Sequence, residues 1–255
     1  MITPRHILCV LGTGLDLDEV ERAAKNTGFE LDHEYSETGA DPRMPRAFRA
    51  SAAEASFTEA DWDAVESHDT VAYVLARPTL PGTGPLVSGL VLELTARLLR
   101  AGATAAKDES NGLTHGRDRW LELADAAAGA DDEDERAVHL YHAFVKRTIF
   151  DGELYYSCGM HLLGLPDVEV EWPDGSEPEP DEVAGLIDAL ALYLLTEERG
   201  AEVEEGEGFR LAEDAPRWIL RHHPCDRYED DLFANPFGYW RLTPDEPRPG
   251  DAAPR

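Results

Sequence analysis

Residues 87–120 read VSGLVLELTARLLRAGATAAKDESNGLTHGRDRW, and residues 183–218 read VAGLIDALALYLLTEERGAEVEEGEGFRLAEDAPRW. The two stretches align with a single two-residue insertion, and the Arg-Trp pair that ends the first also ends the second. We interpret them as two copies of one unit. This duplication predicts two halves related by pseudo-two-fold symmetry, with Trp120 and Trp218 in equivalent places.

Each copy begins with the spacing of an amphipathic helix. Apolar residues lie at i, i+3, i+4, i+7 and i+11 in both stretches, so one face of each helix must be buried. Gly102 and Gly200 follow the helices as C-caps do, and a strand precedes each copy. The unit reads strand, helix, strand, helix, which predicts an α+β fold of mixed sheets with flanking helices. Gly89 and Gly185, inside the helices, indicate a close approach to a sheet or to the other copy.

An acidic run suggests a boundary between the two halves. We predict an N-terminal half at 1–130 with the first copy, an acidic linker at 131–136, and a C-terminal half at 137–243 with the second copy. The remaining residues, 244–255, are rich in Pro, Asp, Gly and Ala and are predicted to be a disordered tail. A calcium loop would alternate its acidic residues, whereas these are contiguous, which favours a solvated linker. They are Asp131, Asp132, Glu133, Asp134 and Glu135.

Three segments outside the repeat are harder to assign. Residues 137–150 mix apolar and polar side chains without a clean helical stripe, and we predict a strand there. Residues 174–182 form an acidic, proline-rich loop on the surface. The aromatic stretch 219–242 is predicted to pack back on the core as a covering segment.

The net charge is strongly negative. The chain has 52 acidic and 23 basic residues, for a net charge of −29. Such a surface repels nucleic acid and anionic membranes and attracts cationic partners, so we predict no nucleic-acid or membrane partner and consider a basic protein that meets Asp131 to Glu135. Adaptation to high salt, or the codon bias of a high-GC genome, would produce the same acidity without any partner. The sequence does not indicate an oligomeric state.

The cellular location is inferred from the ends and the cysteines. No apolar run approaches the roughly 18 residues that a membrane-spanning helix needs. The N-terminus lacks the basic and apolar regions of a signal peptide. The three cysteines, Cys9, Cys158 and Cys225, are odd in number and fit reduced thiols better than disulfides. We therefore expect a cytoplasmic protein.

Residues 158–170 read CGMHLLGLPDVEV. This segment resembles a short Gly-Leu-Pro-Asp-x-Glu-Val phrase of the bacterial family called domain of unknown function 4261. A second likeness is the helix end at 100–103 followed by Asn-Gly-Leu-Thr-His at 111–115. The resemblance covers about 70 to 220 of the chain and implies no activity, cofactor or site residue.

The chemistry-bearing residues do not form a coherent catalytic set. Cys158 and His161 are three apart and would point to opposite faces of a strand. His139 and His142 have a helical spacing within a predicted strand, so we predict no metal ligands, no catalytic residue and no cofactor. His115 lies in the loop after the first repeated strand, and the equivalent loop of the second copy has no histidine. If the two halves form a cleft, this loop would border it. We interpret His115 as a binding residue, together with the paired Arg119, Trp120, Arg217 and Trp218.

These observations favour a binding or interaction protein, of the immunity or stress-accessory kind, with a strongly acidic surface. The alternative is a hydrolase with its site in the cleft between the two repeat halves.

Overall fold

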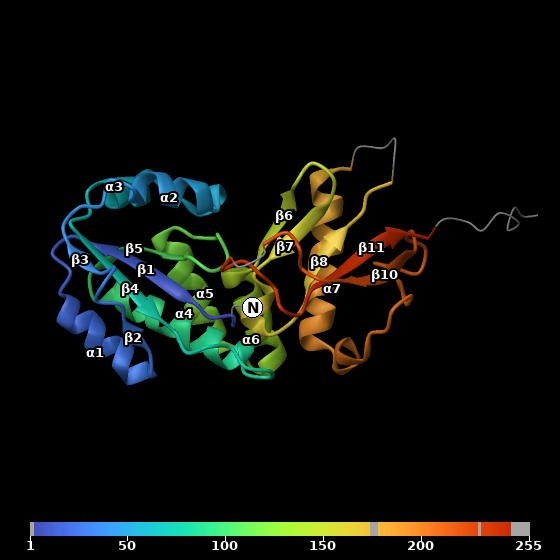
Figure 1. Cartoon of the computed structure of the whole chain (residues 1–255), viewed down its shortest axis with the longest axis horizontal. Coiled ribbons are helices and arrows are strands. Elements are labelled where there is room, and N and C mark those ends of the chain that lie inside the picture. The colour runs from blue at the N-terminus through green and yellow to red at the C-terminus, as the bar shows by residue number, and fades with distance from the viewer. Residues whose placement is uncertain (1–2, 174–177, 229–230, 246–255) are drawn as a thin grey trace, which may run out of the picture.

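Two β-sheets, one from each half of the chain, form the framework of the computed structural model, which describes residues 3–173, 178–228 and 231–245 (Figure 1). The fold is α+β, as predicted. The first sheet has the order β2-β4-β1-β5, with β3 also paired to β4, and all its pairs are antiparallel. The strands are β1 (Ile7–Gly12), β2 (Glu30–Leu31), β3 (Glu37–Thr38), β4 (Thr70–Leu75) and β5 (Ala103–Asp108).

Helices cover both faces of the first sheet. Alternation along β1 sends Leu8 and Val10 to the core shared with α1 (Leu17–Thr27) and α4 (Gly84–Arg100). It sends Cys9 to the opposite face, which packs against α2 (Met44–Ser51) and α3 (Glu59–Glu66). A capping box between Thr58 and Asp61 begins α3. The apolar run in β1 is therefore buried on both sides.

The second sheet has the order β6-β7-β8-β11-β10-β9. Its pairs are antiparallel except that β8 and β11 run parallel. Helix α7 (Pro180–Thr196) packs on β6 and β8, and α6 (Glu133–Phe144) lies between α7 and the helices α4 and α5 (Arg117–Gly129). The strands are β6 (Lys146–Phe150), β7 (Tyr155–Cys158), β8 (Asp167–Val170), β9 (Gly208–Phe209), β10 (Trp218–His223) and β11 (Tyr239–Pro244).

One hydrophobic core connects the two sheets. A single cluster of buried side chains extends from Leu8 in the first sheet through α4, α6 and α7 to Leu242 in the second. Short 3-10 helices complete the fold at η1 (Glu54–Ser56), η2 (Met160–Leu163) and η3 (Glu198–Glu202). Across the described ranges, no helix is both long and apolar enough to cross a membrane.

The predicted duplication is not confirmed. Both copies do contain a strand followed by a helix of 17 residues, namely β4 with α4 and β8 with α7. The copies then diverge, because Trp120 lies in helix α5 whereas Trp218 begins strand β10. The expectation of equivalent tryptophans is therefore wrong. Residues 201–217 are acidic, contain Gly206 and Gly208, and have no helical apolar stripe, so they do not form a counterpart of α5.

The glycines inside the two long helices also differ. A β-carbon at Gly89 would lie 2.5 Å from the guanidinium of Arg136, whereas one at Gly185 would meet nothing within 4 Å. The predicted close approach to a sheet or to the other copy is therefore wrong at both glycines, since Gly89 faces a side chain of α6 and Gly185 faces open space.

The acidic run at 131–136 is a helix start and not a linker. The carboxylate of Asp132 accepts a hydrogen bond from the backbone N–H of Glu135 at 2.8 Å and caps α6. The strand predicted at 137–150 is wrong over its first part, because residues up to Phe144 belong to α6. Only Lys146–Phe150 forms a strand. The apolar stripe that the prediction missed lies at i, i+3, i+4 and i+7. It consists of Ala137, Leu140, Tyr141 and Phe144, all buried.

The aromatic stretch 219–242 is not a covering segment. It supplies β10 and β11, and β11 lies inside the second sheet between β8 and β10. The predicted tail begins at Pro244, which is the last residue of β11, and 246–255 lie outside the described residues. Of the predicted acidic loop, 174–177 are also outside them, and α7 begins at Pro180.

Candidate functional site

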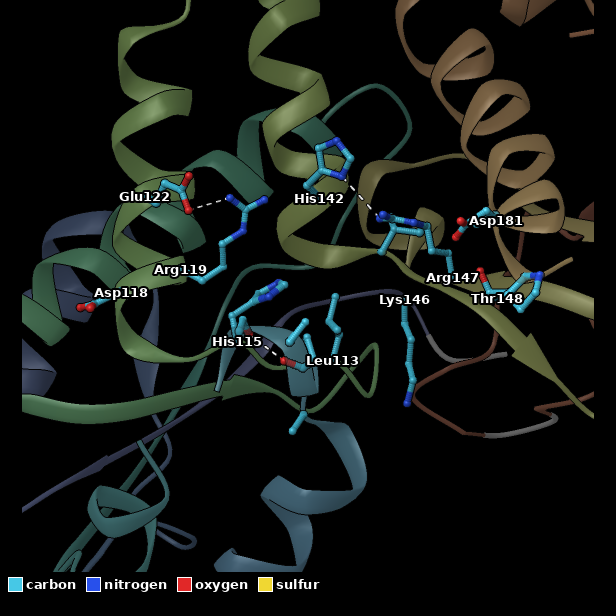
Figure 2. A pocket seen from close by; sticks show the side chains of 17 residues that line it. Leu113, His115, Asp118, Arg119, Glu122, His142, Lys146, Arg147, Thr148 and Asp181 are labelled. Atoms are coloured by element: carbon cyan, nitrogen blue, oxygen red, sulfur yellow. Dashed lines mark hydrogen bonds and ion pairs between the residues drawn. The ribbon is translucent and has the colours of Figure 1, made fainter. Parts of the chain in front are cut away.

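A cleft of about 1060 Å³ opens between the two halves of the chain (Figure 2). The N-terminal half contributes the turn after α2, at 52–56, and the loop and first turns around the start of α5. The C-terminal half contributes the end of α6, the start of β6 and the first turn of α7. The polar side chains of the lining include His115, Asp118, Arg119, Glu122, His142, Lys146, Arg147, Thr148 and Asp181.

His115 is buried in the wall of the cleft, where it makes one hydrogen bond and one ring contact. Its Nε2 lies 3.2 Å from the carbonyl oxygen of Ala143, and its ring meets Trp120 edge to face with centroids 4.9 Å apart. Burial lowers the pKa of His115 to about 4, so the imidazole is neutral at neutral pH. A neutral ring whose Nε2 faces a carbonyl donates there, which makes that nitrogen unavailable as a general base.

Three cationic side chains line the cleft. Arg119 on α5 donates to the Glu122 carboxylate at 2.7 Å. Arg147, in β6, lies 2.9 Å from Asp188 and 3.5 Å from Nδ1 of His142. Burial and then the Arg147 charge lower the pKa of His142. The Lys146 ammonium donates to the carbonyl oxygen of Gly112 at 3.2 Å. Figure 2 shows Arg119 and Arg147 on opposite walls, with the Lys146 side chain extending from the wall of Arg147 in a different direction from Arg147.

The backbone is strained where β6 borders the cleft. Thr148 has φ 59°, and within the described ranges it is the one non-glycine residue with positive φ. The pairing of β6 with β7 shifts register between Lys146 and Ile149, so Thr148 lies in a bulge. A β-branched residue in this region is a conformational outlier, and such strain gathers at binding and catalytic sites.

The structure brings together only part of the predicted binding set. His115 and Arg119 line the cleft, and Trp120 lies behind His115, fully buried, with its Nε1 donating to the Ala106 carbonyl oxygen at 2.9 Å. The other two residues lie elsewhere. Arg217 pairs with Asp245 at 2.7 Å and Trp218 packs on Trp172, both on the second sheet.

Sequence reasoning missed the lining residues of the C-terminal half. Lys146 and Arg147 are adjacent, and two consecutive basic residues in so acidic a chain are a usable signal. His142 belongs to the segment for which a strand is predicted, and its place at the end of a helix follows only from the structure. The predicted partner-facing acids from Asp131 to Glu135 are exposed at the start of α6 and do not line the cleft.

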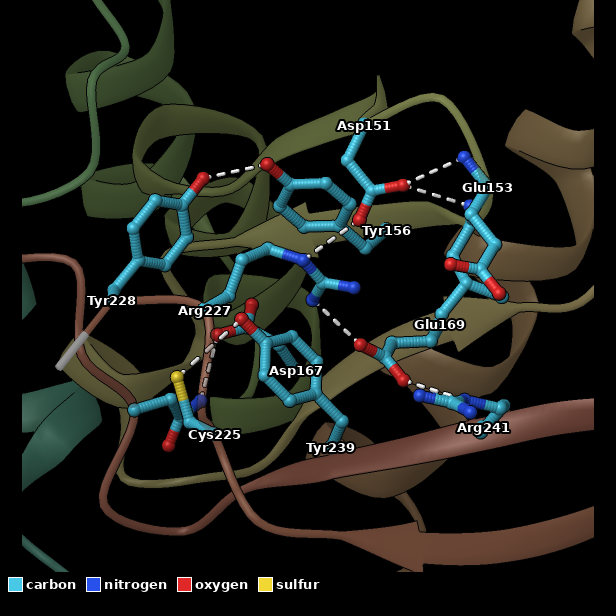
Figure 3. Close-up of polar contacts among 12 residues, drawn as sticks. Asp151, Glu153, Tyr156, Asp167, Glu169, Cys225, Arg227, Tyr228, Tyr239 and Arg241 are labelled. Carbon is cyan, nitrogen blue, oxygen red and sulfur yellow. Dashed lines mark hydrogen bonds and ion pairs between the residues drawn. The ribbon is translucent and has the colours of Figure 1, made fainter.

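A second polar cluster lies on the face of the second sheet (Figure 3). Glu169, 2% exposed, accepts from Arg227 at 2.6 Å and from Arg241 at 2.8 Å. The Arg227 guanidinium lies over the rings of Tyr156 and Tyr239, 4.2 and 5.1 Å from their centroids. Asp151, Glu169, Arg227 and Arg241 are all ion-paired, and Arg227 thereby connects the segment before β11 to the sheet.

The cleft lacks the geometry of a nucleophile–base pair among the residues described. There, no hydrogen bond joins the ring of His115 or His142 to a hydroxyl, thiol or carboxylate. Across the same ranges, no group of three or more His, Cys, Asp or Glu residues could hold a metal ion. The arrangement is suited to binding through positive charge and hydrogen-bond donors.

Neither the protein-family models nor the curated proteins nor the solved structures contain a match to this chain. The resemblance to the domain of unknown function 4261 family therefore stays a prediction.

Proposed function

We propose that this protein is a binding protein that holds a small ligand in the cleft between its two halves. The observation that carries the proposal is the cleft itself, about 1060 Å³ in volume and lined by side chains from both halves. Pockets of this size accommodate small molecules, and sites between structural halves are common places for them. The strained Thr148 and the buried His115 support the same location.

The alternative, a hydrolase at the same site, has weaker support. It needs a base that can accept a proton from a nucleophile or water. His115, with a pKa of about 4 and its Nε2 directed at a backbone carbonyl, is poorly suited to that task. His142 lies against the Arg147 guanidinium, which further disfavours its protonated form.

Filling the cleft tests the proposal. Ala184 lies on α7 in the lining, and Ala184→Trp would occupy the cleft. Ala60→Trp, on an exposed turn of α3, is the matched control. We expect compounds in a small-molecule library to raise the melting temperature of the wild type and of the control but not of Ala184→Trp. Compounds that stabilise all three proteins equally would contradict the proposal, and hydrolysis of chromogenic esters lost only in Ala184→Trp would favour the hydrolase.

We also propose a basic protein partner and a cytoplasmic location. The first is supported by the net charge of −29 and by the exposure of Asp131 to Glu135, because acidic surfaces steer cationic partners. The second is supported by three cysteines that form no disulfide, two of them buried. Salt adaptation would produce the same charge without any partner, and association kinetics distinguish the two.

A further inference from the structure

We propose that the ligand of the cleft is an anion with phosphate or carboxylate oxygens, and that the ammonium of Lys146 binds it. This inference rests on the proposed function and adds the chemical class of the ligand.

The three lysines of the chain differ in their partners. Lys25 lies 2.9 Å from Glu21, and Lys107 lies 2.8 Å from Glu109. Lys146 has no carboxylate within 4.0 Å among the described residues, and its hydrogen bond goes to the neutral carbonyl of Gly112. With 52 acidic residues against 23 basic ones, a half-buried lysine that contacts no carboxylate among the described residues is a candidate for an external counterion.

Among the described residues, the carboxylates near the cleft lie more than 4.0 Å from the Lys146 ammonium, and Asp188 beside the cleft is paired with Arg147. The lining acids Asp118, Glu122 and Asp181 are all exposed to solvent, and the side chain of Asp118 is 95% exposed. Water and salt screen such exposed charges strongly. Lys146 is more buried than these acids, so solvent screens its attraction for a bound anion less strongly.

Two arginines add to the positive charge of Lys146. Each also has a carboxylate partner, because Arg119 donates to Glu122 at 2.7 Å and Arg147 lies 2.9 Å from Asp188. Arg119 and Arg147 lie on the two walls and can donate further hydrogen bonds to a ligand with several oxygens.

The number of free N–H donors on Lys146 is compatible with such a ligand. An ammonium has three N–H donors, and the Gly112 carbonyl takes one of those of Lys146. The remaining two can bind oxygens of one phosphate or carboxylate group. Charge-assisted hydrogen bonds of this kind are the strong ones in proteins.

Competitive acetylation locates the anion directly, because the chain has only three lysines to compare. Wild-type protein is treated with a trace of acetic anhydride in the presence of inorganic phosphate, pyrophosphate or citrate, with sodium chloride at matched ionic strength as reference. Mass spectrometry then reports the labelling of each lysine. We expect protection of Lys146 relative to Lys25 by at least one of the three anions, and the pattern distinguishes phosphate from carboxylate ligands.

Titration calorimetry with the protecting anion gives the energetic test. We expect Lys146→Met to raise the dissociation constant about tenfold or more. Lys25→Met removes the same charge from a remote surface helix and should leave binding unchanged, and Lys146→Arg should retain most of it. Circular dichroism establishes that each variant is folded.

Two results would overturn the inference. One is equal labelling of Lys146 with and without all three anions, a measurement on the wild type that does not depend on variant folding. The other is equal loss of binding in Lys146→Met and Lys25→Met, which would mean general charge screening. A neutral library compound that binds in wild type and not in Ala184→Trp would leave the proposed function standing while the anion proposal fails.

Discussion

The imidazole of His6 is hydrogen-bonded through Nδ1 to the carboxylate of Asp108, and both side chains are completely buried. The contact joins residues 102 positions apart, at the start of β1 and the end of β5. The other ring nitrogen lies 2.8 Å from the hydroxyl of Ser88, which donates to the carbonyl oxygen of Leu162 at 3.1 Å. A polar chain thus crosses from the first sheet through α4 to η2 in the other half.

Asp108, His6 and Ser88 are hydrogen-bonded in the sequence carboxylate, imidazole, hydroxyl that a hydrolase triad has. Here the three residues connect the two halves of the fold and do not form an active site. A catalytic serine must reach its substrate, whereas Ser88 has no exposed surface and its hydroxyl is bonded to a backbone carbonyl. We expect Ser88→Ala to lower the free energy of unfolding by about 1–3 kcal/mol, because it leaves His6 Nε2 buried without a partner. Urea unfolding measures this loss. The exposed Ser67→Ala is the control, and equal stability of the two variants would contradict it.

A second prediction concerns the contact of α4 with η2. A β-carbon at Gly84 would lie 2.2 Å from the carbonyl group of Leu163, which is backbone and cannot move aside cheaply. Gly84→Ala should therefore destabilise the protein by about 3 kcal/mol. Gly185→Ala, in the matching long helix with open space around it, should instead stabilise by about 0.5–1 kcal/mol. Opposite shifts in melting temperature are the expected result, and shifts of the same sign would contradict the contact.

The pH dependence of stability should depend on His115. Its folded pKa of about 4 lies below the ordinary value of 6.5, so below pH 6.5 the unfolded state takes up a proton that the folded state does not. The stabilising contribution is full above pH 6.5 and is lost as the pH falls to about 4, up to about 3 kcal/mol in all. His115→Gln should flatten this part of the pH profile. Urea unfolding across the interval measures it, and parallel profiles would contradict the burial of a neutral ring.

The ion cluster on the second sheet gives a fourth prediction. Glu169→Gln leaves Arg227 and Arg241 without their shared buried carboxylate and should cost about 3 kcal/mol. Glu171→Gln, on an exposed residue just after the same strand, removes an equal charge and should change little. Thermal and urea unfolding compare the two, and a small effect at Glu169 would mean that water replaces the pair readily.

The last prediction separates the two roles of the acidic run. Asp132→Ala removes the cap of α6 and should destabilise the protein by about 1 kcal/mol. Glu133→Gln with Asp134→Asn leaves that cap in place and should chiefly slow the association of a basic protein, since exposed charges act mainly on the rate. Surface plasmon resonance against the basic proteins that bind wild type, at low and high salt, measures it. Unchanged association rates would favour salt adaptation.

A helix can be predicted from the sequence where the spacing of apolar residues or a capping motif lies within the helix segment itself. The apolar stripes of α4 and α7 and the capping box of α3 predict helices that the structure contains. In each case the spacing of side chains along one helix determines which face is buried. The signal is ambiguous in α6, because Val138 adds an apolar residue outside the stripe at i, i+3, i+4 and i+7 and so favours a strand.

The sequence by itself determined the α+β class, the long helices and the acidic character, because these follow from composition and local periodicity. Tertiary structure alone decided that β11 enters the second sheet parallel to β8, that Trp218 begins a strand, and that Lys146 lies across a cleft from Arg119. Strand order and the lining of a cleft depend on contacts between residues far apart in the chain. Their free energy comes from packing that no local pattern encodes.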